Sequence, residues 1–357
     1  MKATMAVSVK GDNSPKPEIN NFRKKILLWY DKHQRRLPWR AVKGQKPDPY
    51  YVWLSEIMLQ QTTVITVGPY FEKFTAKWPT IHDLAKADRE DVMHEWAGLG
   101  YYARARNLHK CAQIVSNELN GAFPEDQKDL EKLPGIGGYT SAAIRAIAFN
   151  KPANVVDGNI ERVMARLYAI RQPLPDSKAK LKELAADLAD DRNDRPGDYA
   201  QALMDLGATI CTPTSPKCSL CPVSDMCAAC ALGIAETLPA RKAKKAKPQK
   251  YGEVYWITNK GGEVLFIRRG EKEMLGGMPG LPTSEWREKT IKKPPAKSIR
   301  HSFTHFDLTL EIKAMTAEKA HKIGLIPPEK DHYWVASSKV GELGLPTLFA
   351  KAVKLMK

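Results

Sequence analysis

The sequence predicts a chain of two parts, an all-α N-terminal region and a smaller α+β domain after it. Apolar residues recur at helical spacing within 22–30 and again within 108–119. Strict alternation in 306–312, and two apolar runs at 254–258 and 264–268 around an Asn-Lys-Gly-Gly turn, are typical of strands. The length of 357 residues also exceeds what one hydrophobic core usually holds.

The boundaries follow from composition. We expect residues 1–20 to be disordered, because they are polar and show no helical or strand period. The helical domain then covers 21–238, and a basic linker covers 239–250, within which RKAKKAKPQK has no apolar period. The α+β domain covers 251–357 and closes with a helix at 345–357, with Pro346 suited to its first turn.

The charge of the chain indicates the class of partner. Fifty-six Lys and Arg against 40 Asp and Glu give a net charge of +16, and the pI is about 9.4. Such a balance favours a polyanion, because neutralised phosphates release their condensed counterions. No apolar stretch is long enough to cross a bilayer and the first residues lack a signal peptide's apolar centre, so we expect a cytoplasmic protein without a membrane partner.

A glycine-rich turn joins two predicted helices at about 131–149. It reads Leu-Pro-Gly-Ile-Gly-Gly-Tyr-Thr at 133–140 and precedes a small-residue helix at 141–149, which is typical of a helix-hairpin-helix. Backbone N–H groups at the start of the second helix suit a DNA phosphate without reading bases. An ordinary interhelical turn is the alternative.

Two carboxylates stand in contrasting surroundings. Asp157 follows Val155-Val156 and precedes a predicted helix at 161–169, so it is either a simple N-cap or a half-buried functional group. Glu56 lies within an apolar helix, where burial favours the protonated acid, although a surface glutamate is the alternative. One acid and one anionic stabiliser are what cleavage through a sugar cation requires.

Five of the six cysteines fall within twenty residues. Cys211, Cys218, Cys221 and Cys227 are spaced by six, two and five residues, and Cys230 follows as a spare. This crowding predicts a metal site, either an iron–sulfur cluster or zinc.

The order of these motifs resembles the endonuclease III superfamily of base-excision DNA glycosylases, and within it the adenine DNA glycosylases of the MutY type. The most specific matches are LPWR at 37–40, WLSEIMLQQT at 53–62 and GLGYYARARNLHK at 98–110. The resemblance implies a helix-hairpin-helix glycosylase fold, with a six-helix lobe and an iron–sulfur lobe, followed by a Nudix-like (MutT-like) domain. It also implies that Cys211, Cys218, Cys221 and Cys227 bind a four-iron four-sulfur cluster.

The resemblance assigns catalytic roles by position. Glu56 would protonate the adenine, and Asp157 would stabilise the cationic sugar or bond to it transiently. Asn159 would orient the hydrolytic water. Bifunctional relatives carry a lysine where Tyr139 stands, so we expect a monofunctional enzyme without lyase activity.

An adenine must be flipped out of the duplex to reach these groups. The resemblance assigns a wedge to Gln61 and Tyr101, although aromatic residues more often pack in a core. The residues expected to contact DNA are Gln60, Gln61, Tyr101, Gly135, Gly137 and Thr140. Those expected to line the adenine pocket are Leu37, Trp39, Arg40 and Gln201.

The C-terminal domain resembles one in which a Phe-Ser-His loop inspects 8-oxoguanine, and here the loop reads Phe303-Thr304-His305. Threonine keeps the hydroxyl but adds a methyl group. The R-E-x-x-E-E metal motif of true Nudix hydrolases is absent from this sequence, so we expect no pyrophosphatase activity.

The expected substrate is therefore double-stranded DNA with adenine opposite 8-oxoguanine or guanine, bound by a monomer at the bacterial nucleoid. Two enzymatic alternatives are a glycosylase for thymine and one for oxidised pyrimidines. A catalytically silent iron–sulfur DNA-binding protein is a third, but it would have no reason to keep Glu56 together with Asp157.

Overall fold

The computed structural model describes residues 18–42, 44–189, 194–243, 246–291, 293–328 and 331–357. Most of the segment predicted to be disordered, 1–20, lies outside them. The first helix, α1 (Ile19–His33), begins slightly before the predicted start of the helical domain. Its buried face carries Phe22, Ile26 and Tyr30, the stripe that predicted this helix.

The chain folds into two compact units, and neither is one continuous stretch. The first comprises Met1–Trp53, Pro124–Glu131 and Ile136–Ala243; the second comprises Leu54–Phe123, Lys132–Gly135 and Lys244–Lys357. Helices in the middle of the chain thus group with the C-terminal sheet, and each unit is described by itself.

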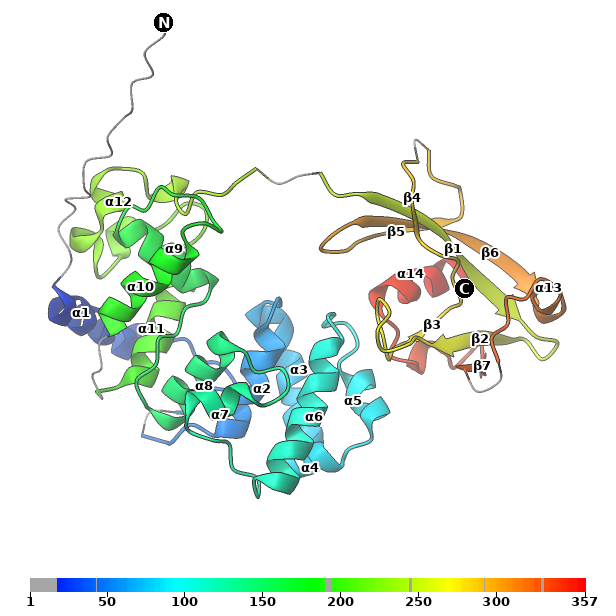
Figure 1. Cartoon of the computed structure of the whole chain (residues 1–357), viewed down its shortest axis with the longest axis horizontal. Helices are drawn as coiled ribbons and strands as arrows, with labels where there is room; N and C mark the ends of the chain where they lie inside the picture. The colour runs from blue at the N-terminus through cyan, green and yellow to red at the C-terminus, as the bar shows by residue number, and fades with distance from the viewer. Residues whose placement is uncertain (1–17, 43, 190–193, 244–245, 292, 329–330) are drawn as a thin grey trace, which may run out of the picture. The chain divides into compact units, whose positions relative to one another are not determined.

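The first unit is helical. Its long helix α11 (Pro196–Thr209) packs against α1, α8 and α9, so α11 forms the centre of this unit. The other helices, labelled in Figure 1, are α7 (Gln127–Glu131), α8 (Gly138–Phe149), α9 (Gly158–Leu167), α10 (Lys178–Ala189) and α12 (Ala228–Ala231), with single 3-10 turns η1 (Cys218–Leu220), η2 (Ser224–Met226) and η3 (Ala235–Thr237).

The second unit contains four helices before its sheet. They are α3 (Val64–Lys77), α4 (Ile81–Lys86), α5 (Arg89–Glu95) and α6 (Ala103–Glu118), while α2 (Pro49–Leu59) crosses the division. Helix α4 begins with a capping box, in which Thr80 and Asp83 each satisfy the other's backbone N–H. Both α4 and α5 pack on α6, whose buried face includes the predicted Leu108, Ala112 and Val115.

The sheet is mixed, with strand order β3-β2-β1-β6-β5. Thr258 of β1 pairs with Val264 of β2 across the predicted Asn-Lys-Gly-Gly turn, but the longest pairing is parallel, from Gln249↔Asp307 to Thr258↔Thr316 between β1 and β6. The strands are β1 (Gln249–Thr258), β2 (Glu263–Arg268), β3 (Pro279–Gly280), β4 (Arg287–Glu288), β5 (Ser298–Ser302), β6 (Asp307–Thr316) and β7 (His332–Ala336).

Each face of the sheet is covered by a different helix (Figure 1). Helix α14 (Thr347–Met356) packs its Leu348 and Phe349 against the alternating residues of β6. Helix α13 (Ala317–Lys322) packs its Ala320 against the opposite face. A 3-10 turn, η5 (Val340–Glu342), precedes α14. The predicted order, a helical region and then a smaller α+β domain, is confirmed.

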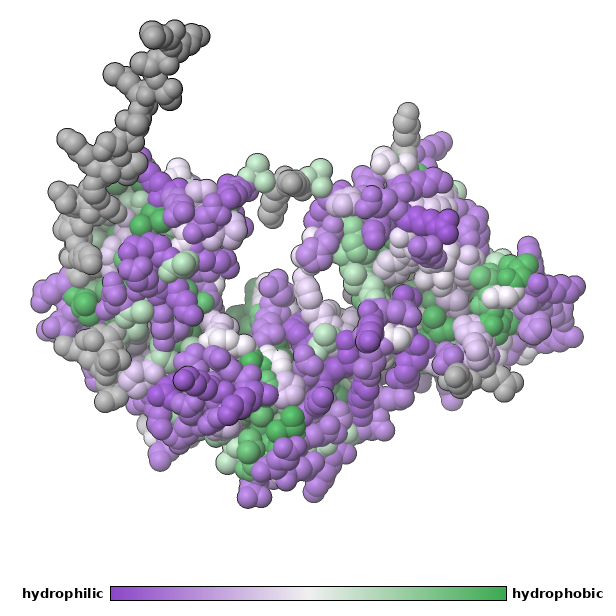
Figure 2. All heavy atoms as spheres, in the orientation of Figure 1, coloured by the Kyte–Doolittle hydropathy of each residue, from purple (hydrophilic) through white to green (hydrophobic). Residues whose placement is uncertain are grey.

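The predicted linker is ordered at both of its described ends. The backbone N–H of Leu174 donates to the Ala240 carbonyl over 2.8 Å, and β1 begins at Gln249. Hydrophilic side chains cover most of the face drawn in Figure 2. Over the residues that the structure describes, no helix has the length and apolar character needed to cross a membrane.

Candidate active site

Glu56 is buried in α2, with only 7 % of its side chain exposed. Trp53 and Ile57, one turn before it and one residue after it, are also buried. The expected burial of this carboxyl group is therefore observed, and the surface alternative does not hold.

Arg104 of α6 fixes the end of the helix that carries Glu56. Its Nη1 donates to the carbonyl oxygens of Ile57 and Met58, each over 2.9 Å, and its Nη2 donates to the Leu99 carbonyl over 2.9 Å. Burial lowers the pKa of Arg104 to about 10. The arginine satisfies carbonyls that a helix end leaves free and connects them to the turn before Tyr101. Arg104 lies in the motif GLGYYARARNLHK, but nothing in the sequence pattern predicted this role for it.

Asp157 is the N-cap of α9, as its structural interpretation predicted, and both of its oxygens are engaged. Oδ1 accepts from the Ile160 backbone N–H over 2.7 Å, and Oδ2 accepts from Asn159 Nδ2 over 2.7 Å. Asp157 is half-buried, and Val155, two residues before it, is buried. These two bonds fix the orientation of the carboxylate.

Asn159 is held by α11 and Arg162. Arg162 Nη2 donates to Asn159 Oδ1 over 2.9 Å and to the Gly207 carbonyl over 2.7 Å. A Cβ at Gly207 would lie 2.6 Å from Asn159 Cβ. Glycine is therefore required here for the start of α9 to approach α11.

We expect Gly207→Ala to reduce the free energy of unfolding by about 1–3 kcal/mol, because overpacking forces backbone shifts. The added methyl group would also displace Asn159 and slow the reaction that the sequence predicts for this site. Denaturant unfolding and single-turnover kinetics measure both effects. Gly68→Ala in α3 is the matched control, since nothing lies within 4 Å of its Cβ; it should stabilise the helix slightly. Equal behaviour of the two variants would contradict the contact.

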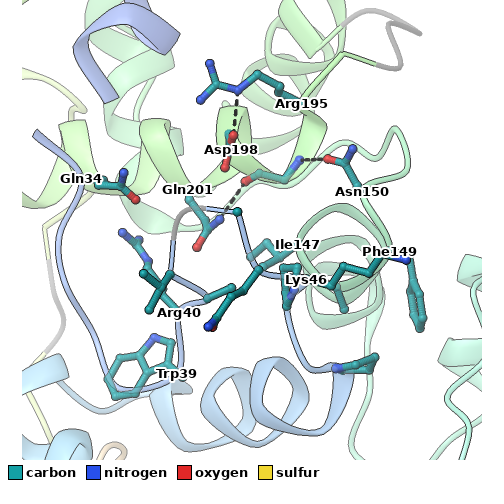
Figure 3. A pocket seen from close by; sticks show the side chains of 18 of the residues that line it. Gln34, Trp39, Arg40, Lys46, Ile147, Phe149, Asn150, Arg195, Asp198 and Gln201 are labelled. Carbon is teal, nitrogen blue, oxygen red and sulfur yellow. Dashed lines mark hydrogen bonds and ion pairs between the residues drawn. The ribbon is translucent and has the colours of Figure 1, made fainter. Parts of the chain in front are cut away.

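Three of the four residues expected in the adenine pocket line one cavity of about 680 Å³ in the first unit. They are Trp39, Arg40 and Gln201, which Figure 3 shows around the cavity, whereas Leu37 is not among the lining residues. Trp39 and Gln201 are buried, and Gln201 Nε2 donates to the Gly197 carbonyl over 3.3 Å. The volume is in the range of small-molecule sites.

Asp205 of α11 binds Arg40, one of the residues that line the cavity, and no sequence pattern was used to predict it. Its fully buried carboxylate accepts from both Nη1 and Nη2 of Arg40 over 2.7 Å, and from Arg35 Nε over 2.6 Å. Burial acts to raise the pKa of Asp205, but the hydrogen bond and charge of Arg40 and the contacts of Arg35 outweigh it and lower the pKa. The residue sits within an apolar helix sequence, as Glu56 does, and that signal could have found it.

The predicted hairpin residues differ in exposure. Gly135, at φ +81°, and Gly137, the N-cap of α8, are exposed. Thr140 is 2 % exposed, so its side chain packs inside. Tyr139 is half-buried in the first turn of α8. The surface of this turn is therefore mainly backbone, a form that suits phosphate rather than base contact.

The expected wedge and recognition residues meet within the second unit. Tyr101, at φ +46° and 49 % exposed, has its hydroxyl 2.6 Å from Thr304 Oγ1. Gln61 is exposed at φ +61°, and Gln60 before it is half-buried. Phe303 stacks on Trp286, whereas His305 is exposed. The exposure of Tyr101 argues against the core-packing alternative for this residue.

The cysteine segment packs around one arginine. Cys218, Cys221 and Cys227 each interact electrostatically with Cys211, so the four cysteines lie near one another. Cys230 is a further neighbour, hydrogen-bonded to Cys218. Over the described ranges, no three His, Cys, Asp or Glu side chains form a single-ion site.

Arg166 of α9 anchors this segment from inside. Its side chain is 1 % exposed and donates to the carbonyls of Thr212, Pro213 and Leu238 over 2.7, 3.1 and 2.9 Å. Its Nη1 also lies 3.3 Å from Cys211 Sγ. Because α9 begins at Asp157, one short helix carries both the carboxylate and the support of the cysteines.

Comparisons with known proteins identify the family of this chain. The human adenine DNA glycosylase is 34 % identical, covering 87 % of this chain and 70 % of its own length. That of Buchnera aphidicola from Schizaphis graminum is 33 % identical, covering 94 % and 99 %. The chain belongs to the adenine DNA glycosylases. As a member of this family it is a base excision DNA repair enzyme, and its partner is DNA.

Family models divide this adenine DNA glycosylase family member into three matched stretches. Residues 54–189 match the HhH-GPD superfamily of base excision DNA repair proteins, 211–227 match the iron–sulfur binding domain of endonuclease III, and 253–355 match a NUDIX domain. The predicted family, fold class and four-iron four-sulfur cofactor are therefore confirmed. The cluster match begins at Cys211 and ends at Cys227.

Solved structures support the helical fold. A thermostable thymine-DNA glycosylase is 32 % identical, with a TM-score of 0.52, over 60 % of this chain and 97 % of its own. A non-covalent endonuclease III–DNA complex is 22 % identical, with a TM-score of 0.50, over 60 % and 96 %.

Proposed function

We propose that this enzyme is a monofunctional adenine DNA glycosylase that removes adenine mispaired with 8-oxoguanine or guanine. The observation that carries the proposal is the fixed carboxylate of Asp157, with both oxygens hydrogen-bonded at the start of α9. A buried glutamate on α2 supplies the second carboxyl group. The curated relatives share the adenine-specific name.

The two carboxyl groups would divide the chemistry. Glu56, buried in α2, would donate a proton to the adenine as the glycosidic bond breaks, and would then accept a proton from the attacking water. The carboxylate of Asp157 would stabilise the cationic sugar, or bond to it transiently. Asn159, held by Arg162, would orient the water. Each role is consistent with the environment of the side chain.

Strand cleavage through an imine would need an amine beside the sugar. Tyr139, in the first turn of α8, has a phenol instead. The product would therefore be an intact strand with an abasic site.

DNA contacts would come from three places. The exposed backbone at Gly135 and Gly137 would hold a phosphate, Gln61 and Tyr101 would fill the space left by the flipped adenine, and Gln60 would support them. The flipped base would enter the cavity lined by Trp39, Arg40 and Gln201, and Leu37, which does not line it, would contact the base from outside. The left-handed backbone of both Gln61 and Tyr101 supports the wedge, because strained residues cluster at ligand contacts.

The C-terminal domain would inspect the opposite base. Thr304 would present its hydroxyl to 8-oxoguanine between Phe303 and His305, and the bond between Thr304 and Tyr101 would be exchanged for bonds to DNA. The cluster ligands would be Cys211, Cys218, Cys221 and Cys227, and Cys230 would stay free. The helical domain, 21–238, and the Nudix-like domain, 251–357, would act as one monomer on DNA in the bacterial cytoplasm, at the nucleoid.

The test uses an end-labelled duplex with adenine opposite 8-oxoguanine. We expect cleavage only in samples treated with hot alkali, because alkali breaks the strand at an abasic site. Cleavage without alkali would contradict the monofunctional assignment, and no product from protein with an intact cluster would contradict adenine excision. An undamaged duplex with adenine opposite thymine is the control and should stay intact.

A thymine-DNA glycosylase activity is the second candidate, because the solved structure described by that name is 32 % identical to this chain. A duplex with thymine opposite guanine, tested in parallel, separates the two candidates. Release of thymine but not adenine would favour this alternative.

A further inference from the structure

A second cavity, of about 430 Å³, lies in the C-terminal domain at one end of the sheet. The beginnings of β1 and β6, the end of β5 and residues just after β4 surround it. Its charged lining residues are Lys250, Lys289, Arg300 and Asp307, and Ser302 and Thr309 add hydroxyl groups. Three cations against one carboxylate make the wall positive.

The cations of this cavity form no close ion pairs among the described residues. Among the described residues, none of Lys250, Lys289 and Arg300 lies within 4.0 Å of a carboxylate oxygen, although ion pairs are frequent elsewhere on this surface. The lysine ammonium groups lie over aromatic rings, Lys250 at 4.8 Å from Phe306 and Lys289 at 5.1 Å from Tyr251. Asp307 is already engaged, because it accepts from Ser302 Oγ over 2.6 Å.

Two more lysines border the cavity. Lys247 Nζ donates to Ser302 Oγ and to the Phe303 carbonyl over 3.1 and 2.7 Å, and Lys351 Nζ donates to the Arg300 carbonyl over 3.0 Å. A concave wall with clustered cations and hydroxyl donors concentrates anions. Guanidinium, ammonium and hydroxyl groups are the donors that phosphate oxygens accept from.

We propose that this cavity binds a backbone phosphodiester of the DNA strand that the C-terminal domain inspects. The location supports it, since Ser302 is the residue before Phe303 in the recognition loop. A base at that loop would bring the backbone of its own strand to the end of β5. Phosphate contacts fix register without reading sequence, so the cavity would position the strand while the loop examines the base.

The test measures binding of the full-length protein to an undamaged duplex by fluorescence anisotropy over a series of KCl concentrations. We expect Lys289→Ala/Arg300→Ala to weaken binding several-fold and to reduce the slope of log K against log [salt] by about 1 to 2, because each lost phosphate contact removes about 0.9. The lysine pair Lys260→Ala/Lys322→Ala, exposed on the same domain, is the control of equal charge.

The result that overturns the proposal is a salt slope for Lys289→Ala/Arg300→Ala equal to that of the control. Lys289→Arg, which keeps the charge, should keep the wild-type slope, and far-UV circular dichroism verifies the fold of each variant. The readout requires no base release. A protein that failed the excision assay could still show this salt dependence, so the two proposals fail separately.

Discussion

Glu56→Gln is expected to slow single-turnover release of adenine by about 10²–10⁴-fold, the usual contribution of a general acid. Glutamine occupies the same buried space in α2 but cannot donate a carboxylic proton. The affinity for the mismatched duplex should remain unchanged, because the side chain is buried rather than part of the DNA-contacting surface. Quench-flow kinetics with excess enzyme, beside anisotropy measurements of binding, gives both quantities.

Asp157→Asn isolates the charge of the second carboxyl group. Asparagine is nearly as good an N-cap as aspartate, so α9 should begin as before while the anion is lost. Glu72→Gln, on the exposed face of α3, controls for removal of a carboxylate and should be fully active.

If Glu56→Gln lost binding together with excision, Glu56 would be structural and the catalytic assignment would be wrong.

Asp205→Ala is expected to reduce the free energy of unfolding by about 3–5 kcal/mol. The substitution removes the buried carboxylate that pairs with Arg35 and Arg40. Arg40 has a nearly buried side chain and would lose two hydrogen bonds at once. Asp225→Ala is the control: its carboxylate also pairs with a basic residue, Lys25, but is 61 % exposed, and such pairs contribute little. Denaturant unfolding at neutral pH compares them.

The ion pair between Asp205 and Arg40 predicts that the stability of the fold depends on pH. The pKa of Asp205 is lower in the folded protein than in the unfolded chain. Its contribution to the free energy of unfolding is therefore fully present at pH values above the pKa of the unfolded chain, and it is lost as the pH falls through the pKa of the folded protein. Wild-type stability should therefore fall more steeply than that of Asp205→Ala below about pH 4. Parallel curves would mean that the ion pair does not stabilise the fold.

Local patterns predicted the helices and strands, but not the way in which they pair. Alternation in 306–312 predicted β6, and the turn at 259–262 predicted the hairpin with β2. The parallel pairing of β1 with β6 joins residues far apart in the chain, and no local signal specifies it. Helix α9 begins three residues before the predicted start, because Asp157 itself caps it.

The candidate site shows the same limit. Carboxylates in apolar surroundings were recognisable, which is why Glu56 and Asp157 could be selected before the fold was known. Their supports were not: Arg104 and Arg162 act through backbone carbonyls of distant segments. A carbonyl acceptor has no side-chain signature, so only the fold reveals such contacts.

Arg166 shows what such carbonyl contacts mean for substitutions at one buried position. Its guanidinium serves three carbonyls and one sulfur from a single buried position. Lysine has one compact ammonium group and cannot reproduce a planar fork, and every smaller residue leaves several acceptors unsatisfied at once. A single substitution of Arg166 is therefore expected to weaken the cysteine segment and the helix that Asp157 caps at the same time.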